Sequence, residues 1–179
     1  PIFAPRPPSG GAIVVLDALN ILENFNLAKY KSNSTVTYHL LAEALRRGHM
    51  DRSRHIGDPS FYDVPVESII SKKRARELKK TINFKSASSY KSMSPDDFLE
   101  ESKDTTHFSI VDEDGNAVSN TFTLGYSFGS GVTIPGTGIL MNNHMNNFAY
   151  RYGDKSIQGR AASPANKFDS GKRPMSTMT

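Results

Sequence analysis

The chain has 179 residues, no cysteine, a net charge of +4 and a mean hydropathy of -0.47. This length fits one domain, and the lack of cysteine excludes disulfides and thiolate metal sites. Because no run approaches the roughly 20 apolar residues that cross a bilayer, the sequence predicts no membrane span.

Two helices are expected in the first third of the chain. A lead-in rich in proline and glycine precedes apolar residues at helical spacing, which predict a helix over residues 11–25. Ser34 has a side chain suited to a helix N-cap, and it precedes a second periodic segment that runs to Arg54. Gly57-Asp58-Pro59 is then expected to end that second helix.

A third helix is predicted over residues 65–81, because Pro65 suits a first helical turn and apolar residues recur after it. Much of the positive charge of the chain lies here, between residues 72 and 80. The basic residues interleave with apolar ones, a pattern typical of a solvated face opposite a buried one: Ile69, Ile70, Leu78 and Ile82. Aromatic residues do not alternate with these bases, so we expect no nucleic-acid partner.

The second half of the chain changes from helical to strand patterns. Residues 86–103, rich in Ser, Lys, Asp and Glu, predict an exposed linker. Runs of β-prone residues follow at 106–111 and 116–124, around the hairpin signal Glu113-Asp114-Gly115. Turn clusters and loop composition follow, above all in residues 150–179. Helices before strands indicate a layered α+β architecture.

The hairpin strands allow two registers. A two-residue loop at residues 114–115 mixes apolar and polar side chains on one face. A three-residue loop, with a glycine in the left-handed conformation, separates an apolar face from a polar one. The apolar face then holds Phe108, Ile110, Val118, Phe122 and Leu124, and the polar face holds Thr105, His107, Ser109, Ser119, Thr121 and Thr123. Binary patterning therefore favours the second register, which places Thr105 opposite Thr123.

Residues 104–118, which read DTTHFSIVDEDGNAV, occur with further short motifs in a fixed order. The others are PPSGG at 7–11, AEA at 42–44, DR at 51–52, GDP at 57–59, FGSG at 128–131, GILMNN at 138–143 and KRPMSTM at 172–178. This ordered series resembles the γ-glutamyltransferase family of N-terminal nucleophile hydrolases over nearly the whole chain.

The resemblance implies a four-layer αββα sandwich built from two subunits. Residues 1–104 correspond to the C-terminal part of a large subunit, with a linker over about 86–104, and residues 105–179 to the N-terminal part of a small catalytic subunit. Self-cleavage of the Asp104–Thr105 bond makes Thr105 the nucleophile. The chemistry suits this role, because a Thr hydroxyl is a weak nucleophile and the α-amine that cleavage creates can act as its base.

Three further site residues follow from the same resemblance. Thr123 is expected to hydrogen-bond the hydroxyl of the nucleophile, in agreement with the favoured hairpin register. Ser176 and Thr177 correspond to a Ser pair that contacts the α-carboxylate of a γ-glutamyl group. Thr in the second position keeps the hydroxyl that this contact needs.

Two positions depart from the family pattern. Gly125 stands where many members have Asn, and Asn147 stands where they have an Asp that pairs with the α-ammonium of the substrate. Loss of that charge-assisted contact is expected to lower affinity for a γ-glutamyl group and to favour hydrolysis over transfer. Asn147 can still accept through its amide oxygen, and His144 lies near it, so both are expected to contact the substrate together with Gly125.

The resemblance implies γ-glutamyl transfer and hydrolysis, with glutathione and related amides as donors and water or amino acids as acceptors. It implies no cofactor, and His107, Asn143 and His144 lack the spacing of metal ligands. Two alternatives stay open. One is a related acylase of the same fold that acts on glutaryl or cephalosporin-type groups, and the other is a non-catalytic fragment.

Parts of the family's site are expected to lie outside these residues, namely an arginine for the α-carboxylate and a glycine pair for the oxyanion. The segment alone is therefore expected to be inactive, and its uncovered strand edges favour self-association. In the complete protein, the remainder of the large and small subunits would be the partner that covers them. The resemblance also implies a periplasmic or secreted location.

Overall fold

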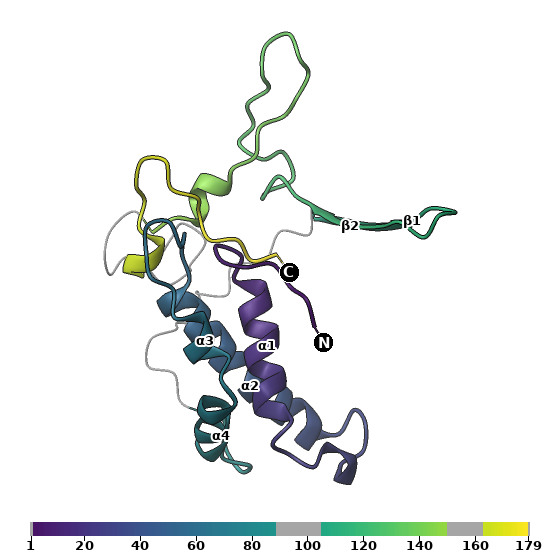
Figure 1. Cartoon of the computed structure of the whole chain (residues 1–179), viewed down its shortest axis with the longest axis vertical. Coiled ribbons are helices and arrows are strands. Elements are labelled where there is room, and N and C mark those ends of the chain that lie inside the picture. Colours follow the sequence, from purple (N-terminus) through teal and green to yellow (C-terminus); the bar gives the residue numbers. More distant parts are fainter. Residues whose placement is uncertain (1, 89–104, 150–162, 179) are drawn as a thin grey trace.

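The structure, a computed structural model, describes residues 2–88, 105–149 and 163–178. Four helices pack together at one end of the molecule, and a two-stranded hairpin projects sideways beyond them (Figure 1). The elements are α1 (Gly11–Leu22), α2 (Thr35–His55), α3 (Val66–Ile69), α4 (Lys72–Lys80), β1 (Thr106–Val111) and β2 (Ala117–Phe122), with 3-10 turns at Leu27–Lys29, His144–Asn147 and Pro164–Asn166. The mixture of helices and strands agrees with the α+β class expected from the sequence.

The two long helices α1 and α2 form the core of the helical part. A small residue at their crossing allows close approach, since a Cβ at Gly48 would lie 2.9 Å from the carbonyl oxygen of Val14. Ser34 caps α2 as predicted, because its Oγ accepts a hydrogen bond from the backbone N–H of Thr37 at 3.3 Å. One apolar cluster is buried between the helices, and it consists of Ala18, Ile21, Leu40, Ala44, Ala75 and Ile82.

The prediction of one continuous helix over residues 65–81 was wrong. The segment divides into α3 and α4 at Ser71, whose backbone is extended and whose Oγ accepts a hydrogen bond from the N–H of Arg74 at 3.2 Å. Ser71 is thus the N-cap of a new helix, and a cap requires a non-helical backbone. The first helix is also shorter than predicted, since it ends at Leu22.

Most basic side chains of α4 are exposed as expected, whereas Arg74 and Lys79 are half-buried. The Arg74 guanidinium contacts both carboxylate oxygens of Asp51, at 2.9 and 2.6 Å, and lies 3.8 Å from Asp17. Both aspartates are buried between the helices. Burial and the neighbouring Asp51 raise the pKa of Asp17 to about 7, and Arg74 only partly offsets this rise.

The loop before the first gap in the described residues is held by polar side chains of α2. The N–H of Ser88 donates to Glu43 Oε1 at 3.1 Å, and Arg47 donates to Glu43 Oε2 at 2.8 Å. Although burial opposes it, these hydrogen bonds lower the pKa of Glu43 to about 2. Of the linker predicted over about 86–104, only residues 86–88 belong to the described part of the chain.

The hairpin has the register that binary patterning favoured. Thr106 pairs with Phe122 and Val111 with Ala117, and the loop closes where the N–H of Asp112 donates to the carbonyl oxygen of Asn116 at 3.0 Å. Gly115 occupies the left-handed region with φ of 81°, as a three-residue loop requires. The second strand ends at Phe122, two residues before the predicted limit.

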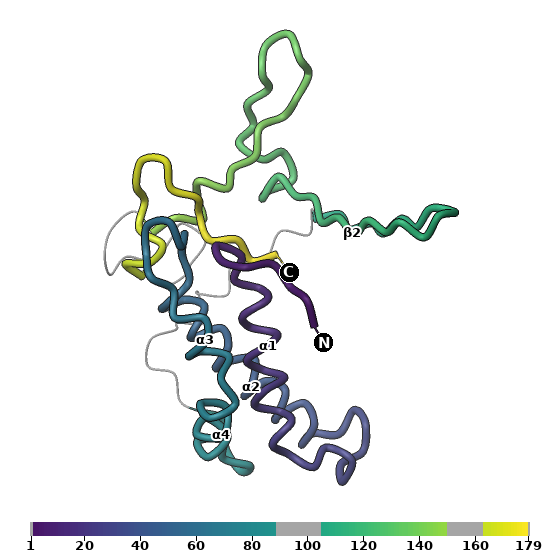
Figure 2. The backbone as a smooth tube through the Cα atoms, viewed as in Figure 1, coloured from purple at the N-terminus to yellow at the C-terminus, as the bar shows by residue number. Residues whose placement is uncertain are grey.

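The last described segment, residues 163–178, returns to the helical part. Figure 2 shows this segment in yellow beside the first residues of the chain in purple, and Ser176 forms a parallel bridge with Ser9. Met175 is buried on α1 against Ile13, with Ile56 and Ile69 in the same cluster. No helix among the described residues is long and apolar enough to span a membrane.

Candidate functional site

Thr105 lies exposed immediately before β1, and Asp104 lies outside the described residues. The last pair of the ladder is Thr106 with Phe122, so the next position of the same register sets Thr105 across from Thr123. Thr123 is half-buried and begins a turn, in which its Oγ1 accepts a hydrogen bond from the N–H of Gly125 at 3.0 Å. The two threonines therefore lie at the base of the hairpin, where the chain leaves the strands.

A chain of contacts connects Thr123 to His144 and Asn147. The His144 Nε2 lies 3.3 Å from the carbonyl oxygen of Thr123, and its Nδ1 lies 3.3 Å from the Asn147 side-chain nitrogen. A carbonyl oxygen can only accept, so Nε2 carries the proton and Nδ1 accepts from the Asn147 amide. This arrangement holds Asn147, which is buried in the 3-10 turn His144–Asn147, in a fixed orientation.

Gly125 occupies a position that no other residue could fill without rearrangement. Its φ is 94°, and a Cβ there would lie 1.9 Å from the side-chain oxygen of Asn143. The same oxygen accepts a hydrogen bond from the N–H of Tyr126 at 3.3 Å. The buried Asn143 amide thus lies in the space that a side chain at position 125 would need.

A cavity of about 400 Å³ opens beside this turn. Its walls are mostly amide, hydroxyl and phenol side chains, together with one thioether: Tyr126, Gly129, Ser130, Asn142, Asn143, Met145 and Asn146. None of the residues that the sequence singled out for the site lines this cavity, although Tyr126 and Asn146 are the chain neighbours of Gly125 and Asn147. No group of three or more His, Asp or Glu side chains in the described ranges is arranged to hold a metal ion.

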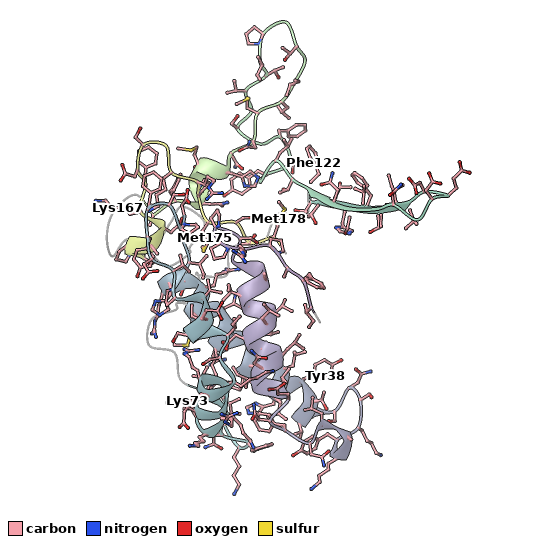
Figure 3. All side chains as sticks on the ribbon, viewed as in Figure 1. Tyr38, Lys73, Phe122, Lys167, Met175 and Met178 are labelled. Atoms are coloured by element: carbon pink, nitrogen blue, oxygen red, sulfur yellow. The ribbon has the colours of Figure 1, made fainter. Side chains whose placement is uncertain are left out.

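The loop with Ser176 and Thr177 is held at several points. The N–H of Ser176 donates to the carbonyl oxygen of Pro8 at 3.0 Å, and its carbonyl oxygen accepts from the N–H of Gly10 at 2.8 Å. Figure 3 labels Met175 just before this loop, where the side chain anchors it on the helical part. Both hydroxyl residues are half-buried.

Arg173 connects the same loop to the segment that follows α2. Its backbone N–H, Nε and Nη2 all donate to the Asp58 carboxylate, at 2.9, 3.0 and 2.7 Å. These hydrogen bonds hold the pKa of the buried Asp58 well below its usual range. Both residues belong to motifs that the sequence comparison singled out, GDP and KRPMSTM, but no local pattern indicates that the two motifs contact each other.

The structure thus brings four of the expected site residues into one network: Thr123, Gly125, His144 and Asn147. Thr105 lies beside this network through the hairpin register, and Ser176 and Thr177 lie on a separate loop. Sequence reasoning missed Asn166, which connects the two parts, because its contacts are distant along the chain.

The arrangement of the helical part and the hairpin matches the N-terminal nucleophile hydrolase fold of a solved relative. Cephalosporin acylase from Bacillus halodurans matches with a TM-score of 0.69 and 30% identity, over 97% of this chain and 28% of that chain. The Gamma-glutamyltranspeptidase family profile matches residues 1–179. The chain belongs to the γ-glutamyltranspeptidase family.

Relatives of this chain include glutathione hydrolases and acylases. The glutathione hydrolase proenzyme of Escherichia coli (strain K12) is 37% identical over 179 residues, and that of Pseudomonas aeruginosa is 41% identical over 186 residues. The acylase ACY 1 proenzyme of Pseudomonas sp. (strain SE83) is 41% identical over 147 residues, which is 82% of this chain and 26% of the relative. The alignment with the Escherichia coli relative covers 99% of this chain but only 31% of that relative, so the chain spans about a third of its length.

Proposed function

We propose that the complete protein transfers or hydrolyses γ-glutamyl groups through Thr105, freed as an N-terminus by self-cleavage at Asp104–Thr105. The observation that carries this proposal is the hairpin register, which pairs Thr106 with Phe122 and so leaves Thr105 and Thr123 at facing positions just outside the two strands. Relatives named glutathione hydrolase proenzymes support it, because a proenzyme is a precursor that must be processed.

In this mechanism the α-amine of Thr105 takes the proton of its own hydroxyl, and the oxygen attacks the γ-carbonyl carbon of the substrate. Collapse of the tetrahedral intermediate releases the amine, which receives the proton, and leaves a γ-glutamyl ester on Thr105. Water or an amino acid then attacks that ester and regenerates the hydroxyl. Residues 1–104 would belong to the large subunit and 105–179 to the small subunit.

We assign substrate recognition to the network around Asn147 and to the loop with Ser176 and Thr177. Ser176 and Thr177 would donate hydroxyl hydrogen bonds to the α-carboxylate of the γ-glutamyl group. Asn147, oriented by His144, would accept from the α-ammonium. The remaining parts of the two subunits would supply the oxyanion donors and cover the apolar face of the hairpin, whose Phe108, Ile110, Val118 and Phe122 are 42% to 57% exposed.

A second candidate is hydrolysis of glutaryl amides, as in an acylase. The specific observation in its favour is Asn147, because a neutral amide does not need a positive charge on the substrate. A glutaryl group keeps the distal carboxylate for Ser176 and Thr177 but lacks the α-ammonium. The similarities to cephalosporin acylase and to acylase ACY 1 support this alternative.

Expression of the complete protein with Thr105→Ala tests the nucleophile, and Thr106→Ala is the matched control on the next residue. We expect Thr105→Ala to stay uncut by intact-mass measurement and to be inactive, whereas the control yields a chain that begins at Thr105. Hydrolysis of a γ-glutamyl anilide and of a glutaryl anilide by the wild type then separates the two candidates. A wild type that neither cleaves itself nor hydrolyses either anilide would mean a non-catalytic protein.

A further inference from the structure

A buried asparagine joins the two parts of the candidate site. The Asn166 side-chain nitrogen donates to the carbonyl oxygen of Asn147 at 2.7 Å, and its side-chain oxygen accepts from the N–H of Met175 at 2.9 Å. Asn166 is 3% exposed. One amide group therefore spans from the turn that carries Asn147 to the residue that precedes Ser176.

The orientation of this amide follows from its partners. The carbonyl oxygen of Asn147 can only accept and the N–H of Met175 can only donate. The side-chain nitrogen of Asn166 must therefore face Asn147, and its side-chain oxygen must face Met175. Backbone contacts hold the residue itself, since its carbonyl oxygen accepts from the N–H of Ala149 at 3.0 Å and its N–H donates to Ser163 at 3.0 Å. Asn166 is thus a short and rigid connection.

The γ-glutamyl group carries its α-ammonium and α-carboxylate on the same carbon atom, so their separation is set by covalent geometry. A site that binds both groups must hold its two contacts at a matching distance, here Asn147 on one side and Ser176 with Thr177 on the other. A glutaryl group has the carboxylate but no ammonium, so it does not require that match.

We propose that Asn166 is a positioning residue that sets the spacing between the ammonium contact at Asn147 and the carboxylate contact at Ser176 and Thr177. This inference rests on the function proposed above. It makes Asn166 a determinant of the choice between γ-glutamyl and glutaryl substrates, although the side chain itself touches neither.

The test compares Asn166→Asp and Asn166→Ala in the complete protein with the same substitutions at Asn20. Asn20 is a matched control because its amide also connects two segments, donating to the carbonyl oxygen of Ile70 at 2.6 Å and accepting from Lys72 at 2.6 Å. It lies in α1, away from the candidate site. For each variant, kcat/KM is measured with a γ-glutamyl anilide and a glutaryl anilide.

We expect the ratio of the two kcat/KM values to shift about tenfold against the γ-glutamyl substrate in both Asn166 variants. This factor corresponds to the contribution of about one buried hydrogen bond. The Asn20 variants should change both substrates equally. Equal changes in the Asn166 variants, with an active wild type, would overturn the inference and leave the proposed function intact. A wild type inactive on both substrates would overturn both.

If the Asn166 variants fail to cleave themselves, hydrogen exchange of the wild-type protein provides a second test, because the N–H of Met175 donates to Asn166. In the complete wild-type protein, the amide of Met175 should exchange slowly, and glutamate should slow it further while glutarate has less effect. Rapid exchange at Met175, or equal protection by the two ligands, would contradict the proposed connection.

Discussion

Replacing Asn147 by aspartate should shift the substrate preference of the complete protein towards γ-glutamyl amides. The side chain is buried and its nitrogen donates to His144 Nδ1. A carboxylate at this position can only accept, and so does Nδ1 of His144, so that contact is lost. The new charge is thus left to pair with the α-ammonium of the substrate.

The size of the shift follows from the two kinds of hydrogen bond. A charged pair contributes about 1.5–3 kcal/mol and a neutral pair about 0.5–1.5 kcal/mol. The difference of about 1–1.5 kcal/mol corresponds to about five- to tenfold in kcat/KM for a γ-glutamyl anilide. A glutaryl anilide offers no ammonium, so the buried carboxylate should reduce its kcat/KM. In the free protein, the uncompensated charge should lower the free energy of unfolding by about 1–3 kcal/mol.

The assay measures kcat/KM of wild type and Asn147→Asp with both anilides at pH 8 and at pH 5.5. The ratio should favour the γ-glutamyl substrate more strongly in the variant at both pH values. An unchanged ratio would refute the assignment of Asn147 to the ammonium group.

Three further outcomes are expected in the complete protein. Gly125→Ala should lower the free energy of unfolding by about 2 kcal/mol or more, because of its positive φ and the contact with Asn143; a urea midpoint equal to wild type would contradict this. Met175→Ala, which empties a buried site, should cost about 2–5 kcal/mol in the same assay. Burial and Asp51 raise the pKa of Asp17 from an ordinary 3.8 to about 7 in the folded state, so its contribution to stability is complete below pH 3.8 and is lost as pH rises to about 7. Asp17→Asn should therefore gain stability relative to wild type across that range, and a constant difference would show that Asp51 and burial do not raise this pKa.

The hairpin was the part of the fold that the sequence predicted best. Alternation of apolar and polar residues distinguishes two registers that differ by one residue, and Gly115 supplies the backbone conformation of the three-residue loop. Both signals are local. The N-cap at Ser34 was predictable for the same reason, since a cap and the helix that it begins are adjacent in the sequence.

The break at Ser71 was missed because a serine inside a periodic segment resembles a surface residue of one helix as much as the cap of another. The contacts of Asp58 with Arg173, and of Asn166 with Asn147 and Met175, were missed for a different reason. They join segments that only the tertiary fold brings together, and no periodicity reports such pairs. The roles of Thr105, Thr123, Ser176 and Thr177 stay predictions, and the Thr105→Ala variant tests the first of them.

Residues 163–178 contact the helical part through the Asp58–Arg173 bridge and the buried Met175. In an uncut chain, the backbone between the two segments keeps them at a high effective concentration, and forming these contacts is the closure of a loop. A cut between residues 104 and 105 would turn the same contacts into part of a quaternary interface. Refolding after denaturation should then depend on protein concentration for the processed form but not for its precursor.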